Sequence, residues 1–290
     1  MASERDVVFA NAGETELKLD IYPAEGEAKR AAILYFHGGG WRGGSREAMR
    51  PDARAMAERG YVGLPAQYRL LGEAPYPACL HDVKAAIRWT RANAGRLGID
   101  EDKIILWGSS AGAHLALLAG GTPDNPEFEG DVGTTGVSSA VAAVIAVHPP
   151  TSFYVGAADP NHSTAATSLL GDNATEAQAR AVSPMTHVTE AYPPTLFLHG
   201  TSDRVVHHSA SQRMLDALRL KRAPADLQLY HGHNHGFCSV PSMRALVAAQ
   251  VDYFLQRTII DKAKFDAEIL ENSMFAQRAA AEASAAATAS

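Results

Sequence analysis

The chain has 290 residues, of which 46% are hydrophobic and 20% are charged, a composition typical of a globular protein with a large buried core. A formal net charge of −6 argues against a basic surface for nucleic acid or for acidic membranes, so we expect a small diffusing substrate instead. Two cysteines, Cys79 and Cys238, exclude a disulfide framework and a cysteine-based zinc site.

The beginning of the chain carries no targeting segment that we recognise. The first ten residues lack the basic start and the apolar run of a secretory signal, and no apolar run of about 18 residues follows anywhere. We therefore expect a cytoplasmic protein without a membrane partner. A chain from which a signal peptide had been removed would begin in the same way, so a secreted protein stays open as the alternative.

Short β-rich apolar runs alternate with helical periodicity from residue 31 to about residue 257, and segments 6–10 and 16–22 predict an antiparallel edge. The expected strands lie at 31–36, 61–68, 104–108, 140–148, 195–200 and 227–231. The expected helices lie at 46–59, 81–94, 110–119, 208–221 and 242–257. This order predicts a three-layer α/β fold, with a mostly parallel central sheet and helices on both faces. We expect one catalytic domain over residues 1–258.

One stretch within this domain breaks the alternation. Residues 149–193 are rich in proline and in small polar residues and show little apolar periodicity. Because they follow a core strand, we expect them to form a lid or a substrate loop.

The second exception is the C-terminal arm, residues 259–290, which ends in an alanine-rich stretch that we expect to be disordered. Before it, apolar residues fall on more than one face of a helix, which predicts burial on two sides. These residues are Ile259, Ile260, Phe265, Ile269, Leu270, Met274 and Phe275. We expect the arm to join two copies into a homodimer, and the alternative is an arm that folds back on its own body.

A candidate nucleophile lies where the strand at 104–108 ends. The run Gly108-Ser109-Ser110-Ala111-Gly112 joins this strand directly to an apolar helix, which is the context that a nucleophile elbow requires. Small residues on both sides leave room for the sharp turn, so the central residue of the pattern presents its hydroxyl above the sheet. Ser110, not Ser109, is therefore the predicted nucleophile.

A glycine-rich loop follows the strand at 31–36 as His37-Gly38-Gly39-Gly40-Trp41. Successive glycines allow backbone N–H groups to approach a ligand, and a tetrahedral acyl intermediate needs such donors. We assign the oxyanion hole to the amides of Gly39, Gly40 and Ala111. A phosphate loop is the alternative, but the chain lacks its lysine-containing pattern.

A serine nucleophile needs a histidine base that is oriented by a carboxylate. Asp203 follows the strand at 195–200, and His235 follows the strand at 227–231. Both lie at the carboxyl ends of their strands, where open α/β sheets gather their active sites. The chain order Ser110, Asp203, His235 is the order of nucleophile, acid and base in α/β-hydrolases.

Six motifs carry a family resemblance across residues 31 to about 257. They are HGGGW, YRL, HDVKAAIRW, GSSAGAHLALL, HGTSD and HNHGF. Together they resemble the α/β-hydrolase superfamily of carboxylesterases, and among these the hormone-sensitive-lipase-like and the acetyl-xylan or feruloyl esterase-like members. Ser109 stands where many lipase-like relatives have Asp, and only 36 residues precede His37, fewer than their N-terminal helical cap needs. The resemblance therefore implies the α/β-hydrolase fold with a more open site.

Several other residues invite a functional interpretation. His231, His233 and His235 alternate along the chain, and together with His207 and His208 they could suggest a metal site. His235 is already the predicted base, and no carboxylate or cysteine is set aside to complete a site, so we expect no metal and no cofactor. Asp82 precedes the nucleophile, and we expect it to act in capping or in a buried ion pair. Trp41, Phe153 and Tyr154 are candidates for the walls of a substrate pocket, although core or lid packing would explain them as well. His148 ends its strand on the same side and is left unassigned.

The sequence thus predicts a serine carboxylesterase that cleaves short-acyl esters, sugar acetates among them, through an acyl-enzyme on Ser110. An amide hydrolase of the arylformamidase or small-peptidase kind would use the same groups, and matched ester and amide substrates would separate the two. A non-catalytic binding protein on the same fold would be expected to lack a member of the triad, and none is missing here.

Overall fold

The computed structural model describes residues 2–154, 168–274 and 276. Its centre is a six-stranded sheet in the order β4-β3-β5-β6-β7-β8, in which all paired neighbours are parallel. The strands are β3 (Ala32–Phe36), β4 (Val62–Pro65), β5 (Ile104–Ser109), β6 (Ala143–Val147), β7 (Thr195–Gly200) and β8 (Ala225–Tyr230). Each lies where the sequence predicts a strand, although β4 and β6 are shorter than expected.

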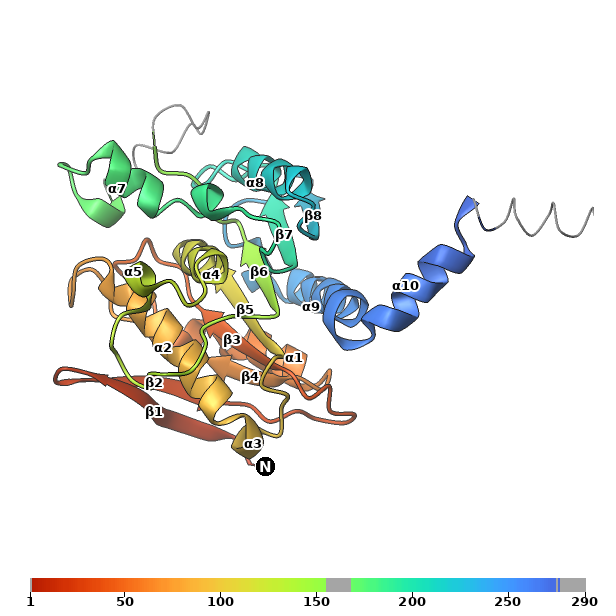
Figure 1. Cartoon of the computed structure of the whole chain (residues 1–290), viewed down its shortest axis with the longest axis horizontal. Helices are drawn as coiled ribbons and strands as arrows, with labels where there is room; N and C mark the ends of the chain where they lie inside the picture. The colour runs from red at the N-terminus through yellow and green to blue at the C-terminus, as the bar shows by residue number, and fades with distance from the viewer. Residues whose placement is uncertain (1, 155–167, 275, 277–290) are drawn as a thin grey trace, which may run out of the picture.

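Helices cover both faces of this sheet (Figure 1), so the predicted three-layer α/β fold is confirmed. The longer ones are α1 (Arg50–Ala57), α2 (Ala78–Ala92), α4 (Ala111–Gly121), α8 (Ser209–Leu220) and α9 (Pro241–Leu255). Alternate residues of a strand enter different cores: Leu34 packs in the core of α2, α4 and α8, while Ile33 and Tyr35 pack in the core of α1 and α9. Burial on both faces explains why these strands are almost continuously apolar.

The predicted N-terminal edge differs in part from the structure. Strands β1 (Glu4–Ala12) and β2 (Thr15–Ile21) pair antiparallel with each other, and two register shifts interrupt their ladder. They form a separate two-stranded sheet, which is joined to β4 by an isolated bridge at Gly63 and to the residue after β4 by another at Ala66. A continuous ladder would need amide donors along this edge, and Pro65 at the end of β4 has none.

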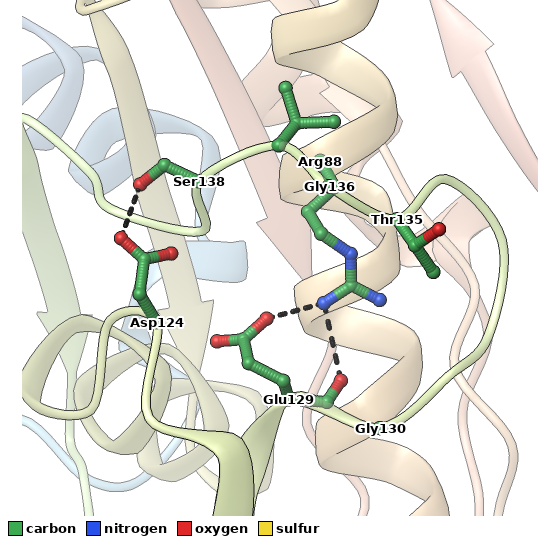
Figure 2. Close-up of a pocket in the computed structure, with 8 residues that line it drawn as sticks. Arg88, Asp124, Glu129, Gly130, Thr135, Gly136 and Ser138 are labelled. Atoms are coloured by element: carbon green, nitrogen blue, oxygen red, sulfur yellow. Dashed lines mark hydrogen bonds and ion pairs between the residues drawn. The ribbon is translucent and has the colours of Figure 1, made fainter.

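The loop after α4 is fastened to α2 by buried charges. Lys84 is fully buried and its Nζ donates to the carboxylate of Glu129, at 2.7 Å, and to the Thr122 carbonyl. Figure 2 shows the neighbouring cavity, of about 370 Å³, where Arg88 pairs with Glu129 and Asp124 accepts a hydrogen bond from a serine hydroxyl. The charges of this cavity are satisfied within the chain, so we interpret it as structural.

Asp82 of α2 is also buried, and its two oxygens bind the Arg69 side chain and the Arg69 amide. The expected structural role of Asp82 in a buried ion pair is therefore confirmed.

The described parts of the expected lid segment are short. They hold α7 (Glu176–Ala181) and the 3₁₀ helix η2 (Pro184–His187), and they enclose a cavity of about 350 Å³ together with residues 75–77. Residues 155–167 lie outside the described residues. A lid or substrate loop at 149–193 remains a prediction.

The C-terminal arm begins with a π-helical turn, η4 (Gln256–Ile260), and continues as α10 (Lys262–Glu271), which projects from the body (Figure 1). Ile259 and Ile260 pack against the core of α1 and α9, whereas Ile269, Leu270 and Met274 are exposed. Phe265 of α10 also contacts the body, with its ring centroid 5.8 Å from that of Tyr253 of α9, so the arm that folds back on its own body stays an open alternative.

The remaining expectations for the C-terminal region are not decided by these contacts. The homodimer and the division at residue 258 stay predictions, and Phe275 and residues 277–290 lie outside the described residues. Within the described part of the chain, no helix is long and apolar enough to span a bilayer.

Candidate active site

Ser110 occupies a strained turn between β5 and α4. Its φ of 52° and ψ of −115° lie in a region that residues with a side chain rarely adopt. The turn is held because the Ser110 amide donates to the Val147 carbonyl of β6 at 2.9 Å, and the Ser110 carbonyl accepts the His114 amide of α4. This strand, turn and helix match the arrangement predicted for a nucleophile elbow.

Glycines on both sides allow the turn to pack against the rest of the sheet. A Cβ at Gly108 would lie 2.2 Å from the Gly112 carbonyl oxygen, and a Cβ at Gly112 would lie 2.2 Å from the Phe36 carbonyl oxygen. Both contacts are to backbone atoms, which cannot rotate away as a side chain can. Helix α4 can therefore lie this close to β5 and β3 only because Gly108 and Gly112 carry no side chain.

We expect Gly112→Ala to destabilise the fold by at least about 2 kcal/mol, since overpacking against backbone forces the helix or the strand to move. Denaturant unfolding followed by circular dichroism measures this change. Gly95→Ala is the matched control, because Gly95 lies in the short helix α3 (Ala94–Leu97) with no heavy atom within 4 Å of the added Cβ. A Gly112→Ala protein as stable as the wild type would contradict the packing argument.

Asp203 and His235 come together beside the turn, although 32 residues separate them. His235 Nδ1 lies 2.7 Å from Asp203 Oδ2, and His235 Nε2 lies 2.9 Å from Ser110 Oγ. An ionised carboxylate can only accept, so Nδ1 carries the proton and Nε2 accepts the Ser110 hydroxyl proton. The three predicted triad residues therefore form one continuous chain of hydrogen bonds.

The environment of Asp203 keeps it ionised. Burial alone would raise the pKa of this carboxyl, but hydrogen bonds from His199, from His235 and from the Val206 amide outweigh the burial and hold the pKa well below its usual range. Asp203 Oδ1 accepts from the amides of Val205 and Val206, both at 2.9 Å. The carboxylate is thus fixed in both position and charge.

The glycine loop lies directly beside the nucleophile. A Cβ at Gly38 would be 3.1 Å from Ser110 Cβ, and the loop then turns around the Gly39 carbonyl, which accepts the amides of Arg42 and Gly43. Gly39 and Gly40 have φ angles of 123° and 59°, which only glycine adopts readily. Within the described residues, the amides of Gly39, Gly40 and Ala111 find no acceptor, so all three remain available to a ligand.

Of the three residues suggested for a substrate pocket, Trp41 and Phe153 are buried in the core and Tyr154 is partly buried against it. Trp41 Nε1 donates to His114 Nδ1 at 3.2 Å, and Phe153 packs on both of these rings. His114 Nε2 in turn donates to the Val182 carbonyl of the expected lid segment, and burial lowers the pKa of His114 to about 4. Tyr154 lies beneath the Arg180 guanidinium. Whether these rings also face substrate stays a prediction.

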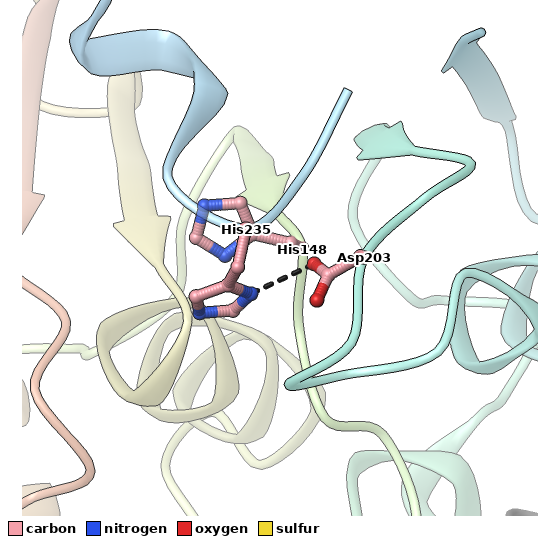
Figure 3. Close-up of side chains that lie close together, drawn as sticks. All are labelled: His148, Asp203 and His235. Atoms are coloured by element: carbon pink, nitrogen blue, oxygen red, sulfur yellow. Dashed lines mark hydrogen bonds and ion pairs between the residues drawn. The ribbon is translucent and has the colours of Figure 1, made fainter. Parts of the chain in front are cut away.

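Two further histidines surround the candidate triad, and the sequence assigned a role to neither. His148, at the end of β6, is buried with its ring centroid 3.9 Å from that of His235, as the group in Figure 3 shows. His148 Nε2 accepts the Gly236 amide, and no described residue partners its Nδ1. Burial, followed by the nearby charges of His235 and His199, lowers the pKa of His148. A neutral ring therefore backs His235.

His199 lies within the apolar strand β7 and points to the same carboxylate. Its Nε2 lies 2.9 Å from the Val206 carbonyl oxygen and 3.4 Å from Asp203 Oδ2, and its Nδ1 lies 2.8 Å from Ser211 Oγ. A polar side chain in a strand that is otherwise apolar, four residues before Asp203, was the available sequence signal for this contact.

Within the described residues, one group of three side chains is close enough to share a metal ion, and it is His148, Asp203 and His235 (Figure 3). Two of its members, Asp203 and His235, already bind each other in the hydrogen-bonded chain that ends at Ser110.

Together, the hydrogen-bonded chain and the free amides of the glycine loop can activate a hydroxyl for nucleophilic attack and can hold a negative oxygen beside it. This is the chemistry of acyl transfer.

Comparisons with known proteins find esterases and a related hydrolase family. A family model described as BD-FAE matches residues 19–218, and a model described as the dienelactone hydrolase family matches residues 179–259. Among curated proteins, Esterase LipQ of Mycobacterium tuberculosis is 31% identical over 88% of this chain and 62% of its own length. Esterase LipC of the same organism is 29% identical over 83% of this chain and 62% of its own length. The chain thus spans about three-fifths of these relatives.

A solved structure is similar over most of both chains. The thermophilic esterase Est2 of Thermogutta terrifontis, in its propionate-bound form, is 30% identical, with a TM-score of 0.76 over 89% of this chain and 95% of that one. Other structures of the Thermogutta esterase are described as butyrate-bound and as phosphorylated by paraoxon.

Proposed function

Because this chain belongs to the BD-FAE family of α/β-hydrolase-fold proteins, we propose that it is a serine carboxylesterase acting through an acyl-enzyme on Ser110. One observation carries the assignment to residues, namely the hydrogen-bonded chain from Asp203 through His235 to Ser110 Oγ, at 2.7 and 2.9 Å. The esterase relatives support the reaction class, and the geometry supports the roles of the three residues.

The proposed reaction has two halves. As Ser110 Oγ attacks the ester carbonyl carbon, its proton passes to His235 Nε2, and Asp203 stabilises the imidazolium that forms. The carbonyl oxygen becomes an oxyanion held by the free amides of Gly39, Gly40 and Ala111. His235 then gives the proton to the leaving alcohol oxygen, and water attacks the acyl-enzyme by the same route in reverse.

Covalent labelling tests this proposal directly. A fluorophosphonate probe reacts with an activated serine, and we expect mass spectrometry to locate the single adduct on the peptide containing Ser110. The organophosphorus adduct of the Thermogutta relative supports this expectation. A protein that hydrolyses acetyl esters but carries the adduct elsewhere would overturn the assignment.

The second part of the proposal is a preference for esters of short acyl chains, with sugar acetates among the substrates. Propionate and butyrate bound to the Thermogutta relative support short acyl groups. We expect kcat/KM to be highest for acyl chains of about two to four carbons, which is the size of the acids bound to that relative. A series of p-nitrophenyl esters measures this preference. Faster cleavage of the decanoyl ester than of the acetyl ester would contradict it.

The proposal also predicts the acid limb of the pH profile. A protonated His235 could not accept the Ser110 proton, so kcat/KM should fall at acid pH, where the imidazole is protonated. Asp203 has a lowered pKa, so it contributes stability that is fully present above about pH 4 and is lost only as the pH falls further.

Protonation of Asp203 therefore does not explain a loss of activity that occurs above about pH 4. Initial rates on an uncharged acetyl ester, with circular dichroism at each pH, separate the two effects. A rate that is constant between about pH 5 and pH 8 would contradict the role of His235.

A further inference from the structure

A cavity of about 430 Å³ opens beside His235 and is lined by Arg204, Val205, Asn234 and His235. Arg204 and Val205 belong to the loop after β7, and Asn234 belongs to the loop after β8. His235 lines the cavity and also places its Nε2 2.9 Å from Ser110 Oγ, so the cavity adjoins the candidate active site at His235.

The positive charge of Arg204, which lines this cavity, has no partner within the described part of the chain. Arg204 is exposed and makes no hydrogen bond, ion pair or ring contact with any described residue. The adjacent Asp203 cannot serve, because its oxygens are occupied by His235 Nδ1 and by the amides of Val205 and Val206. None of the four lining residues is acidic, so the guanidinium has no counter-charge among the residues that the structure describes.

The backbone that carries Arg204 is fixed relative to His235. The Ser202 amide donates to the His233 carbonyl at 3.0 Å, and the Gly232 amide donates to Thr201 Oγ1 at 3.0 Å. These bonds join the loop after β7 to the loop after β8. Arg204 therefore starts from a defined position, and only its side chain has to be ordered when it binds a ligand.

The chemistry of the proposed reaction identifies the part of the substrate that faces this cavity. His235 Nε2 delivers its proton to the leaving alcohol oxygen, so the alcohol portion of the ester has to lie on the His235 side. A guanidinium binds a carboxylate through parallel N–H donors, and the exposed Asn234 amide adds another donor. Val205 supplies an apolar wall for the carbon skeleton.

We propose that Arg204 forms a subsite for a carboxylate on the alcohol portion, so that esters of carboxylate-bearing alcohols are preferred substrates. This inference rests on the proposed esterase function. It goes beyond that function by naming the chemical class of the alcohol and the residue that selects it.

The test compares two acetyl esters of similar shape, para-acetoxybenzoate and the uncharged para-acetoxybenzamide. The measured quantity is the preference ratio, kcat/KM for the anionic ester divided by kcat/KM for the neutral one. Because each variant is measured on both esters, differences in their intrinsic reactivity cancel when the variants are compared. The variants are Arg204→Gln, Arg204→Lys and, as a control, Arg219→Gln, which removes an exposed arginine of α8 that is also without a described partner.

We expect Arg204→Gln to lower the preference ratio about fivefold, the size of one exposed charge pair. Arg204→Lys should retain part of the ratio because it keeps the charge, and Arg219→Gln should leave it unchanged. In the wild type, raising the salt concentration from about 50 mM to about 500 mM should reduce the ratio by screening.

An unchanged ratio in Arg204→Gln would overturn the subsite. An equal fall in Arg219→Gln would overturn it as well, since that result indicates a general surface field. The neutral ester keeps the proposed function separate: if Ser110→Ala abolishes its turnover while Arg204→Gln leaves the ratio unchanged, the esterase function stands and only the subsite fails. If the wild type cleaves neither ester, both proposals fail.

Discussion

Replacing Ser110 by alanine is expected to reduce ester turnover by at least about 10⁴-fold and to abolish labelling by a fluorophosphonate. The acyl-enzyme cannot form without Oγ, while the free amides of Gly39, Gly40 and Ala111 would still bind the substrate carbonyl. Steady-state rates, corrected for spontaneous hydrolysis, measure the loss. The elbow itself should survive, because alanine fits wherever the serine side chain fits.

Ser109→Ala is the matched control for this prediction. Ser109 is the last residue of β5 and is paired with Val147 of the adjacent strand, so its hydroxyl is not part of the hydrogen-bonded chain through His235. We expect this variant to keep most of the activity and to be labelled normally. Equal losses in the two variants, or an adduct on Ser109, would show that the nucleophile has been misassigned.

Asp203→Asn is expected to lower kcat by up to about 10⁴-fold without unfolding the protein. The amide oxygen can still accept from Val205 and Val206, so the local backbone keeps its partners. The new NH₂ group would face His235 Nδ1, which favours the tautomer with the proton on Nε2. That tautomer cannot accept the proton of Ser110, so the nucleophile would no longer be activated.

The measurement combines kcat with an unfolding curve, and Asp216→Asn is the control. Asp216 is an exposed carboxylate on α8 that lies outside the candidate site. We expect the control to match the wild type in both measurements. If Asp203→Asn remained fully active, the carboxylate would be structural and another group would have to orient His235.

Much of the fold could be predicted because its signals are local. Strands buried on both faces are continuously apolar, and the intervening helices show the spacing of apolar residues that is typical of an α-helix. The alternation of the two kinds of segment along the chain therefore predicts the parallel sheet. The candidate triad follows from the same order, because Ser110, Asp203 and His235 each stand just after a predicted strand, and the carboxyl ends of parallel strands share one edge.

The sequence did not reveal how the chain packs around those positions. The N-terminal hairpin was expected at the edge of the main sheet, but it forms its own sheet, since the pairing depends on bulges and on Pro65 in the neighbouring strand. Trp41 and Phe153 were candidates for a pocket wall or for core packing, and only the structure shows that they pack around the buried ring of His114. Apolar and aromatic residues give the same pattern in a core and in a pocket wall.

By itself, the sequence determined the fold class and the candidate residues that the structure brings together, because a turn flanked by glycines and a glycine-rich loop are recognisable at fixed positions along the chain. Only the tertiary structure decided what surrounds them. The strand order places β7 between β6 and β8, and this brings His148 against His235, His199 against Asp203, and the Arg204 loop beside His235. Contacts between residues so far apart depend on strand order and on loop geometry, which no local pattern records.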